Sequence, residues 1–381
     1  MPRVDIELSL IGGTDSVALL ERMGLLFPSD QNPDIMVPYV SLFTLDIRHP
    51  NDNDWSHLVL ITDWHPSVLS TINLGTMRQG SVMYIGPDSL ALVAHWPIVL
   101  ESRLKWKSSA ETVRVLDFCC GSGVQALAIM TQLKVLGVKK CHATFVDINP
   151  RALRFTMMNA YLNGFDDKEV TTILSDITSS ASDHNLNGTF DYILANPPFI
   201  PVPRGTTSKR YGLFSSGGIS GEDVLHKIIN DCPLLLSKSP HAVVGVVSEF
   251  MNPGSKLLNK IKRWWEVYVS SGTKTCGLLV TNEVPVTAEI YAKRRAGDNK
   301  EEVEEWKAHL FREEIKTVSP GVLFLCRTES PRGCISDQLL PSAFNLKHSM
   351  LPKGQMGSIW TPHNYNAVSF SLERWRAVFK A

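Results

Sequence analysis

Residues 113–125 read Val-Arg-Val-Leu-Asp-Phe-Cys-Cys-Gly-Ser-Gly-Val-Gln, and this stretch decides the fold. Its first six residues form a short apolar run, which predicts a strand that ends at a turn. From Val124 the apolar residues follow helical spacing as far as Leu136. Gly121 and Gly123 permit a positive φ and a close approach of a ligand to the backbone. A glycine turn between a strand and a helix is the context in which such a turn binds a nucleoside, although a plain turn remains an alternative.

The alternation of strand and helix continues towards the C-terminus. Four further apolar runs predict strands, with helices between them, over 143–147, 170–174, 190–195 and 242–247. Two later strands, 276–281 and 322–326, bracket a polar segment over 299–316 that we expect to be a solvated helix. The sequence therefore predicts an α/β fold, a doubly wound Rossmann-like sheet of seven strands with helices on both faces.

The 381 residues allow one large domain and a smaller one. Residues 1–83 do not follow the alternation, and a helix over 15–26 and a strand over 58–61 predict a small α+β domain there, with substrate recognition as a candidate role. We expect the main domain over 84–330, with an insert at about 283–318, and a C-terminal extension over 331–381.

Composition narrows the class of protein. Lys plus Arg and Asp plus Glu both number 38, and this zero net charge lowers the expectation of a nucleic acid substrate. The chain has no apolar run of membrane-spanning length and no secretory signal, so we expect no membrane partner and a cytoplasmic location. Two of the seven cysteines, Cys119 and Cys120, are adjacent. That spacing suits neither a disulfide framework nor a zinc site, so we expect reduced thiols and no metal.

Carboxylates follow the second and third predicted strands. Asp147 lies 26 residues after Gly121, where a carboxylate can accept both hydroxyls of a ribose, or can simply cap the helix that begins at Pro150. Asp176 is expected to accept the exocyclic amine of adenine, with Ile177 packed on the ring, and a turn aspartate is the alternative.

Asp117 immediately precedes the glycine turn, and Ala126 replaces the third glycine of the dinucleotide-binding pattern. A carboxylate at this place repels a pyrophosphate but can hold a cationic ligand. S-adenosylmethionine carries a sulfonium and an amine and no phosphate, so the local charge favours it as the cofactor over NAD or FAD.

Asn196-Pro197-Pro198-Phe199 ends the fourth predicted strand, at the sheet edge where doubly wound folds bind ligands. The prolines fix the backbone and bring no N–H donor, which leaves oxygens to face a ligand. A planar amide or aromatic amine could donate to the Asn196 oxygen and the Pro197 carbonyl, with Phe199 flat against it. These residues are the expected catalytic group, acting by orientation and by stabilising positive charge on nitrogen.

Three segments together resemble the class I methyltransferases that carry an Asn-Pro-Pro-Tyr/Phe motif: 115–123, 146–150 and 196–201. Within that group the chain is most similar to the release-factor glutamine methyltransferases, whose two other motifs resemble 86–90 and 213–223. The resemblance covers about residues 84–250. It implies S-adenosylmethionine as cofactor. The implied cofactor-binding positions are Asp117, Cys119, Cys120, Gly121, Gly123, Asp147, Ile148, Asn149, Asp176, Ile177 and Asn196.

The sequence departs from that family at Phe199, where a tyrosine is usual, and at Leu90, where an acidic residue is usual. A protein glutamine is the expected methyl acceptor. An amine of an RNA or DNA base and a small molecule, such as a natural product, remain alternatives, as does a scaffold without activity. The oligomeric state is open.

Overall fold

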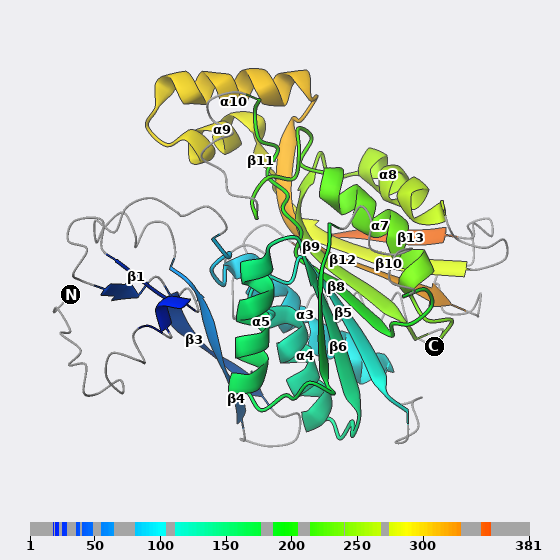
Figure 1. The fold of residues 1–381 in the computed structure, drawn as a ribbon. Coiled ribbons are helices and arrows are strands. Elements are labelled where there is room, and N and C mark those ends of the chain that lie inside the picture. Colours follow the sequence, from blue (N-terminus) through cyan, green and yellow to red (C-terminus); the bar gives the residue numbers. More distant parts are fainter. Residues whose placement is uncertain are drawn as a thin grey trace.

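The computed structural model describes residues 18–28, 36–48, 55–64, 81–103, 111–176, 186–204, 214–267, 274–328 and 344–351, apart from short gaps at 19, 23–24, 39 and 240. One mixed sheet organises these residues (Figure 1). Its parallel half runs in the order β7-β6-β5-β8-β9. These strands are β5 (Val113–Phe118), β6 (Cys141–Asp147), β7 (Val170–Leu174), β8 (Tyr192–Ala195) and β9 (Val243–Met251).

The other half of the sheet contains the antiparallel strand. β12 (Thr317–Thr328) lies antiparallel between β9 and β10 (Lys274–Asn282). All seven expected strands are present, so the doubly wound α/β sheet is confirmed. Two strands of this sheet were not expected: β13 (Phe344–Leu351) pairs in parallel with β10, and the short β11 (Val286–Thr287) pairs with β12.

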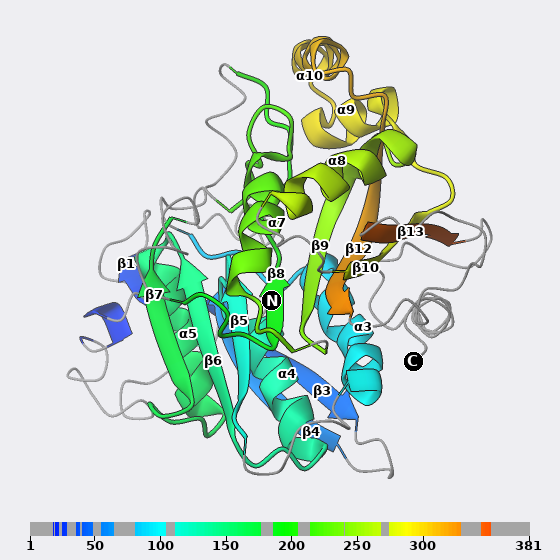
Figure 2. The ribbon, with the colours of Figure 1, turned by 90° about the vertical axis from the view of Figure 1, so that its right-hand side faces the viewer.

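Helices cover both faces of this sheet (Figure 2). One face carries α3 (Pro87–Arg103), α4 (Val124–Val135) and α5 (Pro150–Leu162), and the other carries α7 (Asp223–Leu235) and α8 (Ser255–Glu266). Successive strand residues alternate between the two cores: Val115 belongs to the first hydrophobic cluster and Leu116 to the second. Both side chains are fully buried, which is why the strands read as nearly continuous apolar runs.

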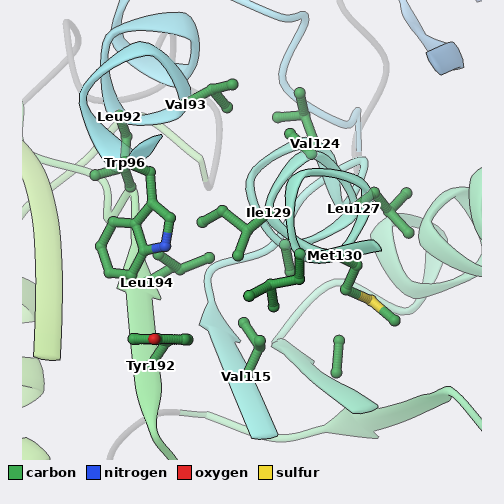
Figure 3. Close-up of a cluster of buried hydrophobic side chains, with 14 of the residues drawn as sticks. Leu92, Val93, Trp96, Val115, Val124, Leu127, Ile129, Met130, Tyr192 and Leu194 are labelled. Carbon is green, nitrogen blue, oxygen red and sulfur yellow. The ribbon is translucent and has the colours of Figure 1, made fainter. Parts of the chain in front are cut away.

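Helix α3 is fixed to the sheet by one large aromatic residue (Figure 3). The Trp96 ring meets Tyr192 of β8 edge-on, with ring centroids 5.7 Å apart, and lies 6.0 Å from Phe324 of β12. A Cβ added at Gly245 on β9 would lie 2.2 Å from the Trp96 ring. The glycine therefore provides the notch that admits the indole.

The N-terminal hairpin packs on the same face. β3 (Val40–Arg48) and β4 (Trp55–Asp63) are antiparallel, and Leu58 and Leu60 join the hydrophobic cluster that contains α4. Asn159 of α5 donates to the Ile61 carbonyl at 3.0 Å and accepts from the Ile61 amide at 2.6 Å. The described part of the N-terminal region thus shares a core with the main sheet, and the domain boundary at residue 83 stays a prediction.

The expected helix over 15–26 was wrong at its C-terminal end. Within the described residues, 20–22 are helical, but Leu26 already begins β1 (Leu26–Pro28), which pairs antiparallel with β2 (Met36–Pro38). The β-branched and aromatic content of this stretch is too small to separate a helix end from a short strand.

Between β10 and β12 the chain forms a helical pair, α9 (Ala288–Ala296) and α10 (Lys300–Arg312), which projects at the top of Figure 1. α10 was expected to be a solvated helix, yet Trp306 and Leu310 on it are fully buried. They pack in a third hydrophobic cluster with Ile200 and Val202, just after the Asn-Pro-Pro-Phe motif. We call α9 and α10 the helical cap. Among the described residues, no helix has the length and apolar character needed to cross a membrane.

We predict that Gly245→Ala lowers the free energy of unfolding by about 1–3 kcal/mol, because the new methyl group overlaps the Trp96 ring. Urea denaturation measures this change. Leu42→Ala, at a site that is 71 % exposed, is the control and should change stability by less than about 0.5 kcal/mol. Equal stability of Gly245→Ala and the unsubstituted protein would contradict the packing described for α3.

Candidate functional site

A cavity of about 360 Å³ lies at the carboxyl edge of the parallel strands. Residues that follow β5, β6, β7 and β8 line it, as does the segment 81–85 that precedes α3. Of the residues expected to bind the cofactor, the structure brings Cys119, Cys120, Gly121, Asp147, Ile148, Asn149, Asp176 and Asn196 together in its wall. Ile177 lies outside the described residues. This edge is where doubly wound sheets bind their ligands.

The turn between β5 and α4 has an unusual backbone. Cys119, Gly121 and Gly123 all adopt positive φ angles, of 54°, 56° and 80°. A Cβ on Gly123 would meet Thr156 of α5 at 3.1 Å and the Phe145 ring at 3.3 Å. The N-cap residue of α4 is Gly123, which has no side chain to bond the first turn, and Val124 and Gln125 of that turn line the cavity. Gly123 does not line the cavity itself, and its part is to let the turn pack against β6 and α5.

Asp147 joins the turn to the next strand. Its Oδ2 accepts a hydrogen bond from the Gly121 amide at 2.9 Å, and its Oδ1 accepts from the Asn149 amide at 2.8 Å. Burial raises the pKa of this carboxyl, while these backbone hydrogen bonds oppose the rise. The carboxylate therefore shapes the turn from within the cavity wall, and its expected contact with a ribose stays a prediction.

Asn149, not Asp147, caps the following helix. Its side-chain oxygen accepts from the Arg151 amide at 3.0 Å, ahead of Pro150 in the first turn of α5. Ile148 and Asp176 both line the cavity. Ile148 is 48 % exposed, and Asp176, which follows β7, is also exposed. An apolar side chain and a carboxyl in one cavity wall suit the face and the edge of a purine.

Asp117 lies beneath the turn rather than in the cavity wall. It is fully buried, and its Oδ2 accepts from the Ala126 amide of α4 at 3.1 Å. No hydrogen-bond partner is found for its Oδ1 within the described part of the chain. Burial raises the pKa of Asp117 to about 8, with the nearby Asp147 carboxylate adding to the rise. A positive charge in the cavity would favour the ionised form of this carboxyl.

Sequence reasoning missed the segment 81–85, which forms one side of the cavity. Asp63, at the end of β4, accepts from the Val82 amide at 2.7 Å and is bonded to Arg151 of α5. Thr62 donates to the Met83 carbonyl at 2.9 Å. The N-terminal hairpin therefore holds this side of the cavity in place. No local motif marks Asp63, because its partners lie 19 and 88 residues away.

Asn196 projects from the end of β8 with its two polar ends in different surroundings. Its Nδ2 donates to Asp88 Oδ2 at 2.8 Å and to Ser89 Oγ at 3.1 Å. Its Oδ1 is buried, with no hydrogen-bond partner among the described residues. A buried amide oxygen without a donor costs free energy, so this atom is suited to accept a hydrogen bond from a ligand.

The backbone after Asn196 is held by the glycine-rich segment 214–223. The Ile200 amide donates to the Ser215 carbonyl and the Gly217 amide donates to the Ile200 carbonyl, both at 3.0 Å. A Cβ on Gly217 would lie 2.8 Å from the Pro198 carbonyl oxygen and 2.7 Å from the Phe199 Cα. The glycine therefore permits close contact between two backbones. Of the motif, Asn196 and Pro198 line the cavity, whereas Pro197 is buried beside it.

The helical cap holds the other side of the motif. Phe199 packs against the third hydrophobic cluster, and His309 of α10 is 2.9 Å from the Ile219 carbonyl oxygen in the glycine-rich segment. Glu249, near the end of β9, accepts from the Tyr291 hydroxyl at 2.6 Å and from Arg295 at 2.7 Å. The cap is thus tied both to the sheet edge and to the motif.

Comparison with known proteins identifies the class. Residues 99–208 match the model of the methyltransferase small domain. The chain is 30 % identical over 149 residues to a candidate protein N5-glutamine methyltransferase of Methanocaldococcus jannaschii, covering 39 % of this chain and 68 % of that protein. The chain therefore belongs to the class I S-adenosylmethionine-dependent methyltransferases and is an enzyme of that class, with S-adenosylmethionine as its cofactor.

A release factor glutamine methyltransferase of Deinococcus radiodurans is 32 % identical over 138 residues, covering 35 % of this chain and 44 % of that protein. The chain thus spans less than half the length of this relative. A candidate class I S-adenosylmethionine-dependent methyltransferase of Listeria monocytogenes aligns over 81 % of this chain and 76 % of its own, with 14 % identity and a TM-score of 0.41.

The cavity residues fit this cofactor. The carboxyl side chains of Asp147 and Asp176 lie in the cavity wall, where they can accept from hydroxyl and amine groups, and the turn 119–123 has no basic side chain that would bind a phosphate. Asp147 and Asp176 would hold the nucleoside and the turn 119–123 would adjoin the amino acid part, assignments that stay predictions. The thiols of Cys119 and Cys120 remain protonated, because burial raises the pKa of both well above the usual value.

We predict that Asp147→Ala weakens S-adenosylmethionine binding by about 1–3 kcal/mol, because a charge-assisted acceptor is lost from the cavity wall. Isothermal titration calorimetry gives the affinity. Asp46→Ala, which removes an exposed carboxylate from β3, is the matched control and should bind as the unsubstituted protein does. Unchanged affinity in Asp147→Ala would count against the ribose assignment.

We also predict a stability difference that depends on pH. The folded-state pKa of Asp117 is raised, so its contribution to stability is fully present below the unfolded value and is lost as the pH rises through about 8. Without ligand, the stability of the unsubstituted protein relative to Asp117→Asn should fall by on the order of 1 kcal/mol per pH unit between pH 5 and pH 8. Urea denaturation across that range measures the slope, and parallel curves for the two proteins would contradict the assignment.

Proposed function

We propose that this methyltransferase methylates the side-chain amide nitrogen of a glutamine in a protein. The observation that carries the proposal is the buried Asn196 Oδ1, an acceptor without a donor at the edge of the cofactor cavity. An amide NH₂ is a donor of the required kind. The names of the two relatives above, both of which refer to glutamine methylation, support the same acceptor.

The surroundings of Asn196 offer an incoming NH₂ group acceptors rather than donors. Pro197 and Pro198 have no backbone N–H, and the side-chain NH₂ of Asn196 is turned towards Asp88 and Ser89. A nitrogen that donates into this group of oxygens is held in one orientation, with its lone pair directed away from them. Orientation of this kind contributes to catalysis by lowering the entropy cost of reaching the transition state.

An amide nitrogen is a weak nucleophile because its lone pair is delocalised into the carbonyl group. Bound S-adenosylmethionine supplies a methyl group on a sulfonium, so transfer forms an N–C bond, breaks a C–S bond and returns that electron pair to sulfur. The nitrogen gains positive charge during transfer, and the Asn196 oxygen stabilises it through the hydrogen bond. The extra proton then leaves to water, so the chain needs no strong base at this position.

Phe199 does not line the cavity but packs against the third hydrophobic cluster, to which the helical cap contributes. The side chain is half-buried in this apolar contact. A tyrosine at this position would bring a hydroxyl that needs a hydrogen-bond partner, and phenylalanine does not. The cap is consequently a candidate for recognition of the part of the acceptor that surrounds the methylated nitrogen. The amine of a nucleic acid base and a small molecule have the same donor chemistry and are the other outcomes of the test below.

Incubation with methyl-labelled S-adenosylmethionine and a cell extract, followed by separation of protein, RNA, DNA and small molecules, tests the class of the methyl acceptor. We expect label in protein, and mass spectrometry of enzymatic digests should place the methyl group on a glutamine side chain. Label in RNA, in DNA or in small molecules would contradict the glutamine acceptor.

Asn196→Ala tests the site in the same assay. Transfer should fall by at least about 100-fold to a low residual rate, while calorimetry should give a cofactor affinity within about threefold of the unsubstituted protein, because the variant removes a contact to the methyl acceptor and leaves the glycine turn intact. Retained transfer by this variant would remove Asn196 from the reaction.

A further inference from the structure

The side-chain amide of Asn196 has two possible orientations, which exchange the positions of Oδ1 and Nδ2. Only one of them suits the proposed reaction. Oxygen and nitrogen of a side-chain amide have nearly the same shape, so the hydrogen-bond partners determine which end points where. In the structure the nitrogen end contacts Asp88 and Ser89, and the oxygen end has no partner among the described residues. In the reversed orientation the amide would direct an N–H donor at the NH₂ group of the methyl acceptor, which is itself a donor.

Asp88 determines which orientation the Asn196 amide adopts. An ionised carboxylate only accepts hydrogen bonds, so the reversed amide would place two acceptor oxygens at the 2.8 Å separation now bridged by a hydrogen bond. Ser89 cannot decide alone, because its hydroxyl can donate or accept. Its 3.1 Å contact with the same nitrogen uses the second Nδ2 proton.

We propose that Asp88 and Ser89 are positioning residues for methyl transfer, which hold the Asn196 amide with its oxygen towards the acceptor nitrogen. This inference rests on the proposed function, because it assumes that Asn196 Oδ1 is the atom that receives the acceptor. In this role Asp88 and Ser89 act through Asn196 and need no contact with the methyl acceptor or the cofactor.

The fold places the two partners on elements that are fixed to each other. Asp88 and Ser89 lie in the first turn of α3, and Asn196 follows β8. Trp96, two turns further along α3, packs edge-on against Tyr192 at the start of β8. The contact between the helix and the strand therefore sets the distance between the carboxylate and the amide.

The backbone before α3 leaves room for this carboxylate. A Cβ on Gly86 would lie 2.4 Å from Asp88 Oδ1, so a larger residue there would displace the carboxylate. Asp88 is 3 % exposed, and the amides of Ser89 and of Asp88 itself also donate to it. A buried carboxylate with this many donors is held in one position.

The charge of Asp88 adds to the effect of its geometry. Burial raises the pKa of this carboxyl and the nearby Glu249 carboxylate raises it further, whereas the hydrogen bonds from Asn196 and from backbone amides lower it. In its ionised form Asp88 polarises the amide through the hydrogen bond from Nδ2, which increases negative charge on Oδ1. A more negative Oδ1 binds more strongly to a nitrogen that is becoming positive than to the neutral acceptor.

A purely structural role is the competing explanation, because an aspartate in the first turn of a helix also stabilises the helix dipole. A double-mutant cycle separates the two roles. A residue that acts through Asn196 has no further effect once Asn196 is replaced, whereas a residue that only stabilises α3 keeps its effect.

Initial rates of methyl transfer from labelled S-adenosylmethionine to the protein fraction of a cell extract provide the first readout. Asp88→Ala should lower the rate about 10-fold to 100-fold, with cofactor affinity within about threefold of the unsubstituted protein. Asp88→Asn keeps an oxygen that can accept and should lose less, while Ser89→Ala should lose activity that Ser89→Thr restores. In the Asn196→Ala background, Asp88→Ala should lower the residual rate by less than about twofold.

Asp191→Asn is the matched control. Asp191 is also a buried carboxylate, 4 % exposed, but it accepts from the Arg114 amide at the opposite end of β8. It should lose stability without losing transfer per folded molecule. Equal rates in Asp88→Ala and the unsubstituted protein, or an additive loss in the double variant, would overturn the inference.

A second readout needs no acceptor. The side-chain NH₂ resonance of Asn196, assigned by its absence in Asn196→Ala, should be shifted downfield and protected from exchange in the cofactor-bound protein. In Asp88→Ala it should move upfield and exchange faster, and an unchanged resonance would overturn the inference. Loss of transfer in Asp88→Ala together with full transfer in Asn196→Ala would instead contradict the proposed function.

Discussion

The side-chain amide of Asn196 is the group on which the rest of the site depends. It lies after the carboxyl end of β8, in the wall of the cofactor cavity. Its nitrogen is hydrogen-bonded, and its buried oxygen has no hydrogen-bond partner among the described residues. Three separate parts of the chain hold it. α3 fixes the amide, the glycine-rich segment 214–223 fixes the following backbone, and the cap packs against the residues after that. A reaction that needs one nitrogen in one orientation requires this degree of constraint.

In the cofactor cavity, too, some residues line the wall and others hold the wall in place. Asp147 lines the cavity while also bonding the turn, whereas Asp117 supports α4 from below and keeps one buried oxygen without a partner. The hairpin β3–β4 supports the segment 81–85 through Asp63 and Thr62. Because these supports come from the N-terminal region, that region contributes to the cofactor cavity in addition to any part in substrate recognition.

The sequence predicted the features that depend on neighbouring residues in the chain, such as the strands and the turns that follow them. Strands of the parallel sheet are apolar on both faces, and the turns after them carry Gly121, Asp147 and Asn196, so these residues could be assigned to one edge before the structure was known. α3 was not predicted, since its apolar residues are nearly continuous and Pro97 lies in its interior. Asp63 and the pairing of Asp88 with Asn196 were missed because they join residues 19 to 108 positions apart. The face of α10 that packs on the motif could not be separated from a solvated face, because Glu, Lys and Arg dominate its composition.

A crystal structure of the protein with bound S-adenosylhomocysteine, the demethylated product, tests the orientation of Asn196 most directly. The sulfur should face the open side of the Asn196 amide, with the ribose on Asp147 and with Asp88 still bonded to Nδ2. A sulfur atom far from Asn196, or an amide whose oxygen has turned towards α3, would contradict the assignment of this group to the reaction.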